Sequence, residues 1–274
     1  MGATFISNRW GDPMSNDILA QLVTMSNNLG DPSLDYVILG EGNTSARADA
    51  DTFWVKASGT ELRTIDRTGF VRVSFERVLA MLNAPDLSDE QIKQRLSEAK
   101  VDPSTGSRLA PDDGVQPSVE TVLHAICLSL EGVNFVGHTH PTAVNAITCS
   151  IAFETAVSGR LFPDEIVICG PAPVVVPYTD PGVPLARKVR DLIDQYIDRH
   201  HEVPKVILMQ NHGLIALGRT AQQVENVTAM AVKAARVLLG TYALDGPHFL
   251  TAQAVDRIHT RPDELYRRKL LGES

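Results

Sequence analysis

Apolar residues recur along this chain with two different spacings, and the spacing changes from one segment to the next. Segments with an apolar residue every third or fourth position predict amphipathic helices, whereas short apolar runs bounded by glycine, proline or polar residues predict strands. Helices are predicted over residues 17–28, 75–83, 88–98, 117–132, 141–149, 185–198 and 221–239. Strands are predicted over residues 36–39, 52–56, 134–140, 165–169, 172–177, 206–209 and 214–217.

The predicted helices and strands are interleaved, which is typical of an α/β protein with a mixed sheet. No internal repeat, low-complexity tract or Gly/Ser-rich linker divides the sequence, so we predict one domain over residues 17–274. Residues 1–16 are polar, carry proline and glycine, and are predicted to form a flexible arm. Residues 102–117 are the most loop-like segment, and a loop of that length is usually functional or mobile.

Composition narrows the class of protein further. The 274 residues are 43% hydrophobic and 21% charged, as in ordinary globular proteins, and such a chain buries a large core without disulfides. With 25 basic and 33 acidic residues the net charge is −8, which argues against a nucleic-acid partner. Cys127, Cys149 and Cys169 are far apart in the sequence and resemble reduced core residues of a cytoplasmic protein.

No segment of the sequence resembles a membrane span or a secretion signal. No stretch approaches 18 consecutive apolar residues, and the first residues lack a basic region followed by an apolar run. We therefore expect a cytoplasmic location and no membrane partner.

Two histidines stand two residues apart in the predicted strand over residues 134–140, as His138 and His140 of VGHTHP. Side chains two apart on a strand share a face, so both imidazoles can converge on one metal ion. A chance pair on a polar strand face explains this spacing equally well. His212, at the end of another predicted strand, favours the metal, because three imidazoles from two strand ends match the ligand set of catalytic zinc.

The predicted helix that begins PSVETVLH supplies an acid–base candidate, Glu120. A carboxylate in the first turn of a helix is favoured in its ionised form by the helix dipole. Its alternative role is simply that of an N-terminal residue that complements this dipole. His124 lies four residues later on the same face, and we interpret it as a structural residue rather than a further metal ligand.

Two segments rich in small residues are candidates for anion binding. They are the predicted loop GEGNTS at residues 40–45 and the turn ASGT at residues 57–60. Glycine lets backbone amides approach an anion, and Asn, Ser and Thr side chains add donors. Lys56 could supply a positive charge beside the second segment. Most turns of this kind only reverse the chain, and GEGNTS lacks the pattern of a dinucleotide-binding loop.

Taken in order, six segments resemble the class II aldolase/adducin superfamily. They are GEGNTSAR, WVKASGTEL, QPSVETVLH, VGHTHP, VVVPYTDPG and LMQNHGLIALG, spanning residues 40–218. Within that superfamily they are most similar to the aldolase part of the bifunctional rhamnulose-phosphate aldolase/lactaldehyde dehydrogenases. The resemblance implies a three-layer α/β/α fold with a central, largely antiparallel sheet, and a homotetramer.

The resemblance also implies a set of site residues. The metal, Zn²⁺ or another divalent transition metal, would bind His138, His140 and His212, and Glu120 would be the acid–base residue. A phosphate would bind the following residues: Asn43, Ser58, Gly59 and Ser118. The implied reaction is cleavage of a ketose 1-phosphate, similar to rhamnulose or fuculose phosphate, to dihydroxyacetone phosphate and an aldehyde.

Two alternatives to this zinc-dependent aldehyde-lyase stay open. Epimerase, dehydratase and decarboxylase members of the superfamily share the same residues, and the adducin head is a non-catalytic interaction module. Two departures from the sugar-phosphate aldolases bear on the substrate. Residues 155–165 contain no tyrosine where those enzymes often place one, and Val119 stands where fuculose-phosphate aldolases carry a second serine.

Overall fold

The structure is a computed structural model that describes residues 17–84, 87–104, 114–263 and 266. The predicted arm over residues 1–16, and residues 105–113 of the predicted loop, lie outside the described residues. The helices are α1 (Ile18–Leu29), α2 (Phe75–Leu79), α3 (Asp89–Glu98), α4 (Thr121–Leu128), α5 (Thr142–Thr148), α6 (Phe153–Ala156), α7 (Pro163–Cys169), α8 (Val183–His200), α9 (Ala221–Thr241) and α10 (Ala252–Thr260). Short 3₁₀ turns cover Pro32–Leu34, Arg67–Gly69, Ala80–Asn83 and Tyr242–Leu244.

Seven strands form one mixed sheet in the order β3-β2-β1-β4-β7-β6-β5. They are β1 (Asn43–Arg47), β2 (Thr52–Lys56), β3 (Phe70–Ser74), β4 (Phe135–Thr139), β5 (Val174–Val176), β6 (Val206–Met209) and β7 (Gly213–Gly218). The β5–β6 pair is parallel and the other pairs are antiparallel. The predicted α/β fold with a largely antiparallel sheet is therefore confirmed.

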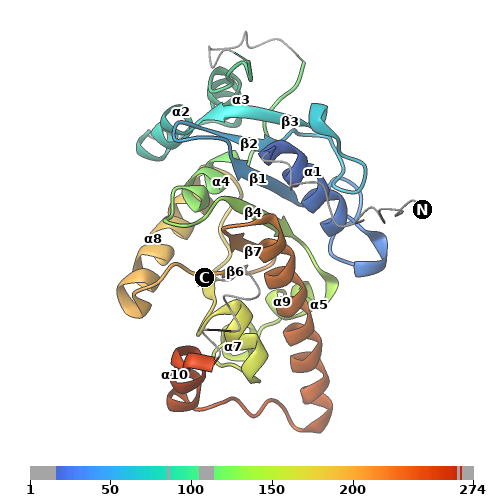
Figure 1. Cartoon of the computed structure of the whole chain (residues 1–274), viewed down its shortest axis with the longest axis vertical. Coiled ribbons are helices and arrows are strands. Elements are labelled where there is room, and N and C mark those ends of the chain that lie inside the picture. Colours follow the sequence, from blue (N-terminus) through green and yellow to red (C-terminus); the bar gives the residue numbers. More distant parts are fainter. Residues whose placement is uncertain (1–16, 85–86, 105–113, 264–265, 267–274) are drawn as a thin grey trace, which may run out of the picture.

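Helices cover both faces of this sheet (Figure 1). On one face α4 and α8 pack against the strands, and on the other face α1 and α9 do so. Strand β7 shows how the sequence builds both layers. Its Leu214 and Ala216 are buried with residues of α9, whereas Ile215 and Leu217, which point the other way, are buried with residues of α4 and α8.

Capping residues fix where several predicted helices begin. The Asp17 side chain accepts from the backbone N–H of Ala20 at the start of α1. Ser88 and Gln91 form a reciprocal capping box at the start of α3, as the Ser-Asp-Glu-Gln sequence there predicts.

The long helix over residues Ala221–Leu244 meets the length and composition of a membrane-spanning helix, which the sequence analysis did not anticipate. One face of α9 packs against β4 and β7, and other parts of it contact α5 and α7. Val224 and Val227 on this helix are fully buried. The most apolar 18-residue window of this helix is 33% buried, so packing in the core accounts for only part of its apolar composition.

The prediction of a strand over residues 165–169 is wrong, because this apolar run is helix α7. Pro163 opens the helix, acidic residues fill its first turn, and Gly170 ends it with a φ of +79°. All five residues of the run are buried. Apolar residues on every side remove the periodicity that distinguishes a short helix from a buried strand.

The first strands of the sheet also differ from prediction. Residues 36–39 form an irregular segment instead of a strand, and residues 43–47, predicted as loop, form β1. The β3 strand was not predicted at all. The small polar residues of β1 have little intrinsic strand preference, but β2 and β4 pair with them from both sides.

Candidate active site

The end of strand β4 and the turn between β6 and β7 bring the three predicted histidines together. His138 pairs in register with Ile215 of β7, so the β6–β7 turn that carries His212 lies beside the end of β4, where His140 follows. The ring centroids of these three residues, the histidine triad, lie 4.7, 4.9 and 5.3 Å apart. One nitrogen from each ring lies within 4.8 Å of the other two, a group that could hold a metal ion.

Gly213 makes this convergence possible. A Cβ atom at residue 213 would lie 2.7 Å from Cδ2 of His140, 3.2 Å from Cε1 of His138 and 2.6 Å from the carbonyl oxygen of Thr139. Any other residue would therefore press against two rings of the triad and against backbone. Sequence analysis singled out His212 but not the glycine that follows it.

Hydrogen bonding and burial keep His138 neutral, with one ring nitrogen unprotonated, which is the form that binds a metal ion. Its Nδ1–H donates to the carbonyl oxygen of Leu214 at 2.9 Å, which leaves Nε2 without a proton and facing Nε2 of His140, 2.9 Å away. Burial lowers the pKa of His138 to about 4, and burial together with the neighbouring His138 lowers the pKa of His140 to about 4. Both imidazoles are therefore neutral at pH 7, the state in which they bind metals.

Glu120 lies at the N-cap of α4, one residue before the helix, and not in its first turn as predicted. Its side chain makes no capping hydrogen bond and is 10% exposed. Its Oε1 lies 3.1 Å from Nε2 of His212, and its Oε2 lies 3.6 Å from Nε2 of His138. This carboxylate contacts the triad, so a role limited to the helix terminus does not account for its position.

The environment of Glu120 keeps it ionised. Burial opposes the ionisation of Glu120. The electrostatic interaction with His138, which becomes positively charged only below about pH 4, and the hydrogen bonds from His212 and Asn43 together hold the pKa of Glu120 well below the usual range of a glutamate. The Asn43 Nδ2 donates to Glu120 Oε2 at 2.5 Å. Glu120 thus enters the site as a carboxylate, the form that accepts a proton.

Three buried side chains, those of Asn43, His124 and Ser45, form a series of hydrogen bonds that starts at Glu120. Asn43 Oδ1 contacts Nε2 of His124, and Nδ1 of His124 lies 2.6 Å from Oγ of Ser45. Burial lowers the pKa of His124 to about 4, so this ring is neutral. His124 points away from the triad toward β1, and the structure does not bring it to the predicted metal position.

The residues predicted to bind phosphate gather beside Glu120, where β2 ends. The backbone of residue 57 bridges to Pro117, Ser58 N–H donates to the Gln116 carbonyl at 2.8 Å, and Ser118 N–H donates to the Lys56 carbonyl at 3.3 Å. The Lys56 side chain is buried, with Nζ donating to the Gly40 carbonyl at 3.2 Å.

Two cavities open at this end of the sheet. One of about 430 Å³ is lined by Ser58 and Gly59, and by residues of the loops around Asp66 and Gly114. The other, of about 400 Å³, is lined by His140 and by Asp35, Glu41, Thr142 and Asn145. Glu41 was not singled out from the sequence, although its Oε1 lies 3.8 Å from Nδ1 of His140.

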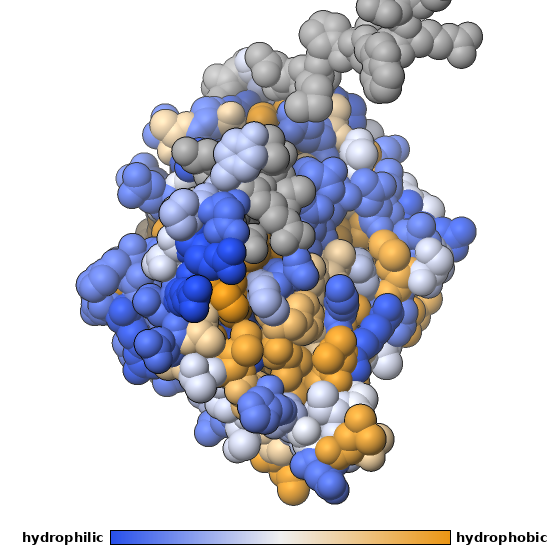
Figure 2. Space-filling model, turned by 60° about the horizontal axis from the view of Figure 1, so that its bottom comes forward, coloured by the Kyte–Doolittle hydropathy of each residue, from blue (hydrophilic) through white to orange (hydrophobic). Residues whose placement is uncertain are grey.

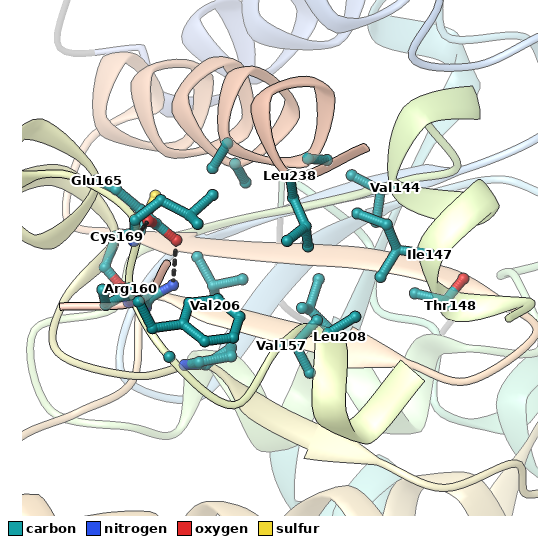
Figure 3. A pocket seen from close by; sticks show the side chains of 18 residues that line it. Val144, Ile147, Thr148, Val157, Arg160, Glu165, Cys169, Val206, Leu208 and Leu238 are labelled. Carbon is teal, nitrogen blue, oxygen red and sulfur yellow. Dashed lines mark hydrogen bonds and ion pairs between the residues drawn. The ribbon is translucent and has the colours of Figure 1, made fainter. Parts of the chain in front are cut away.

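A third cavity, of about 50 Å³, lies away from the site between α5, α7 and α9 (Figure 3). Its wall is mostly apolar, with Thr148 and a buried ion pair in which Arg160 Nη1 lies 2.9 Å from Glu165 Oε1. Figure 2 shows the molecule with the lower end of Figure 1 turned toward the viewer. Apolar side chains gather in the middle of this face, and hydrophilic side chains lie on both sides of them. None of the predicted site residues lines this cavity.

Two curated proteins are similar to this chain in sequence. The chain is 28% identical over 191 residues to a Bacillus subtilis protein named uncharacterized oxidoreductase YuxG, with 67% of this chain and 24% of that protein covered. It is 32% identical over 120 residues to methylthioribulose-1-phosphate dehydratase from a Picosynechococcus species, with 42% of this chain and 55% of that protein covered. The chain therefore spans about a quarter and about half of the lengths of these curated relatives.

Several solved structures are similar to this chain in fold. The N-terminal class II aldolase domain of a conserved protein from Thermoplasma acidophilum superposes with a TM-score of 0.62 at 28% identity, covering 86% of this chain and all of that one. L-Fuculose-1-phosphate aldolase from Thermus thermophilus shares the fold, with a TM-score of 0.55 at 16% identity over 84% of this chain and 98% of that one. The family model for the class II aldolase and adducin N-terminal domain matches residues 20–239, and the chain therefore belongs to that family.

Proposed function

We propose that this chain is a metal-dependent aldolase that cleaves a ketose 1-phosphate, similar to rhamnulose or fuculose phosphate, to dihydroxyacetone phosphate and an aldehyde. The observation that carries the proposal is the contact of the Glu120 carboxylate with His212 and His138. It sets a carboxylate directly beside two of the three histidines that could hold a metal ion.

The residues of the triad fit Zn²⁺ or another divalent transition metal. Three neutral imidazoles are a common ligand set of catalytic zinc, and the backbone at Gly213 leaves room for the rings to meet. His138 Nδ1–H bonded to a backbone carbonyl is the usual way in which a metal-binding histidine is oriented. A metal ion bound there would act as a Lewis acid toward the carbonyl group of the substrate.

Glu120 moves the proton in this proposal. During cleavage the C3–C4 bond of the ketose breaks, the ionised Glu120 accepts the proton that the C4 hydroxyl loses as the aldehyde forms, and the bonding electron pair stays with C3. Glu120 then delivers a proton to C3, which completes dihydroxyacetone phosphate, and it removes that proton in the reverse direction. A general acid–base residue of this kind contributes about 100- to 10,000-fold in rate.

The phosphate group would bind where β2 ends. Lys56 supplies a buried ammonium group, Ser58 and Ser118 supply hydroxyl groups, and Gly59 supplies a backbone N–H. Asn43 supplies an amide whose second N–H is not used by Glu120. Superfamily members bind sugar phosphates, which supports this assignment.

A dehydratase is the second candidate. The relative that is 32% identical is named methylthioribulose-1-phosphate dehydratase, and its name describes another ketose 1-phosphate. Epimerase and decarboxylase activities use the same kind of site. A non-catalytic module like the adducin head has less support, because the triad and Glu120 are all present and in contact.

Three further assignments are part of this proposal. We place the chain nearest to the aldolase part of the bifunctional rhamnulose-phosphate aldolase/lactaldehyde dehydrogenases, in the cytoplasm and in a single domain over residues 17–274. We also propose a homotetramer, because superfamily members often form oligomers. Light scattering of the purified protein tests the last assignment directly.

Proton exchange tests the proposed chemistry without knowledge of the aldehyde. Zinc-loaded protein is incubated with dihydroxyacetone phosphate in D₂O, and loss of the C3 proton signal is followed by NMR. An aldolase should exchange this proton stereospecifically, and should release dihydroxyacetone phosphate from a panel of ketose 1-phosphates. Absence of both, together with water loss from methylthioribulose 1-phosphate, would replace the aldolase by the dehydratase.

A further inference from the structure

Four buried polar side chains form one continuous chain of hydrogen bonds that ends on the proposed acid–base residue. Ser45 contacts His124, His124 contacts Asn43, and Asn43 contacts Glu120. Ser45, His124, Asn43 and Glu120 are 0%, 1%, 5% and 8% exposed. Glu120 and His124 come from the start of α4, and Asn43 and Ser45 come from β1, so two elements far apart in sequence build the chain together.

The chemistry of the four groups fixes the direction of every hydrogen bond. An ionised carboxylate only accepts, so Asn43 must turn its Nδ2 toward Glu120 and its Oδ1 toward His124. The amide oxygen also only accepts, so His124 must carry its proton on Nε2. Its Nδ1 then accepts from the Ser45 hydroxyl. All donors along the chain therefore point toward Glu120.

This arrangement excludes the other orientation of the Asn43 amide. Rotation of the amide by 180° would place its oxygen against the Glu120 carboxylate, which is a repulsive contact. Glu120 thus selects the orientation of the amide, and His124 holds it there by donating its Nε2–H to the amide oxygen, with no hydrogen bond of its own to Glu120.

The selected orientation has a second consequence. Both hydrogens of Asn43 Nδ2 lie on the side of the amide that faces the site, and one of them bonds Glu120. Within the described part of the chain, the second has no acceptor, and it is available to an oxygen of the substrate.

We propose that His124, supported by Ser45, is a positioning residue that holds the Asn43 amide with its nitrogen toward Glu120 and the substrate. The inference rests on the proposed function for its catalytic meaning, but the orientation itself does not. Any buried imidazole needs partners on both ring nitrogens. The feature particular to His124 is that one of these partners is the Asn43 amide, whose other end bonds Glu120.

Neutron diffraction on crystals of the full chain, exchanged into D₂O, tests the orientation independently of any activity. We expect deuterium on Nε2 of His124, none on its Nδ1, and two deuterium atoms on Asn43 on the side of Glu120. Deuterium on Nδ1 of His124, or the Asn43 oxygen facing Glu120, would overturn the proposal.

Substitutions test the functional meaning through the dihydroxyacetone phosphate exchange reaction. His124→Leu removes the donor that holds the Asn43 amide. We expect exchange to slow by about 10- to 100-fold, the value of the charge-assisted hydrogen bond from Asn43 to Glu120 that would lose its orientation, with a smaller change in KM. His124→Gln retains an N–H near the position of Nε2 and should recover most of the lost rate. Equal losses in both variants would mean that His124 only fills space.

A buried pair on the opposite face of the same strand provides the control. Ser26 Oγ and Thr44 Oγ1 lie 2.7 Å apart, both fully buried, and neither contacts Glu120. Ser26→Ala should lower the thermal midpoint of unfolding like His124→Gln but leave the exchange rate within about twofold of wild type, because it breaks a buried hydrogen bond elsewhere. A large rate loss in Ser26→Ala would attribute the His124 effect to general loosening of β1.

The double variant separates action through Asn43 from independent action. If His124 works only through Asn43, adding His124→Leu to Asn43→Ala should cost less than about threefold beyond Asn43→Ala alone. Multiplying losses would contradict the proposal. If wild-type protein shows no exchange at all, the proposed function fails, while the neutron result still decides the orientation.

Discussion

Nε2 of His212 lies 3.1 Å from Oε1 of Glu120, although the two residues are far apart in the sequence. His212 arrives on the turn after β6 and Glu120 at the N-cap of α4. The contact joins a potential metal ligand to a carboxylate that is held ionised, so loss of either group should affect the same reaction.

Removal of the metal should abolish activity and leave the protein folded. The triad lies at strand ends in a sheet that a large core already holds, so the metal is not needed for folding. His212→Ala should lower bound zinc, measured by atomic emission, from about one equivalent per chain to a small fraction of that. His248→Ala, an exposed histidine away from the triad, is the matched control. Full activity after verified metal removal would contradict the metal-dependent reading.

Glu120→Gln should retain zinc but lose at least about 100-fold in turnover, because the amide has nearly the same shape and cannot transfer the proton. Zinc content and the exchange rate are measured on the same sample. Glu225→Gln, on α9 and bonded to Asn28, controls for the loss of one acidic residue and should leave both values unchanged. Near-normal turnover in Glu120→Gln would assign proton transfer to another group.

Gly213→Ala should weaken zinc binding by about 10- to 100-fold, the usual cost of disturbing the groups that orient metal ligands. The added methyl group would collide with the His140 ring and with backbone of Thr139. Competition with a chelator of known affinity gives the number. Gly240→Ala, where a Cβ meets nothing within 4 Å, should bind zinc as wild type does. Equal affinities in the two variants would mean that the rings have room to move.

A phosphorylated ketose should be a much better substrate than its unphosphorylated parent. Asn43→Ala with Ser118→Ala should lower kcat/KM for the phosphorylated sugar by about 100-fold or more, since each charge-assisted hydrogen bond contributes roughly 1.5–3 kcal/mol. Asn43 also contacts Glu120, so this double variant should slow the free sugar too.

Lys56→Met separates the phosphate contribution more cleanly, because Lys56 acts on Glu120 only through its charge and makes no hydrogen bond to it. We expect it to lower kcat/KM for the phosphorylated sugar strongly and for the free sugar little. Steady-state kinetics on both sugars measures the difference. Equal efficiency of wild-type protein toward both sugars would indicate an unphosphorylated substrate.

Local patterns in the sequence suffice to predict the class of the fold, the long amphipathic helices α8 and α9, and the convergence of His138 and His140. His212 was added by the ligand set of zinc sites and Glu120 by the resemblance to one family, because both lie far from these histidines in the sequence. Helical periodicity depends on residues that are close together in the sequence, and side chains two residues apart on a strand share a face.

The other features depend on contacts between segments that are far apart in the sequence. β1 is a strand because β2 and β4 pair with its backbone from both sides, and α7 is a helix although residues 166–169 are all apolar and give no helical periodicity. The close approach of Gly213 to two rings of the triad and the contact of His124 with Asn43 join segments that are distant in sequence. Periodicity carries no information about such contacts, because the free energy that fixes them comes from burial and hydrogen bonds between elements rather than within one.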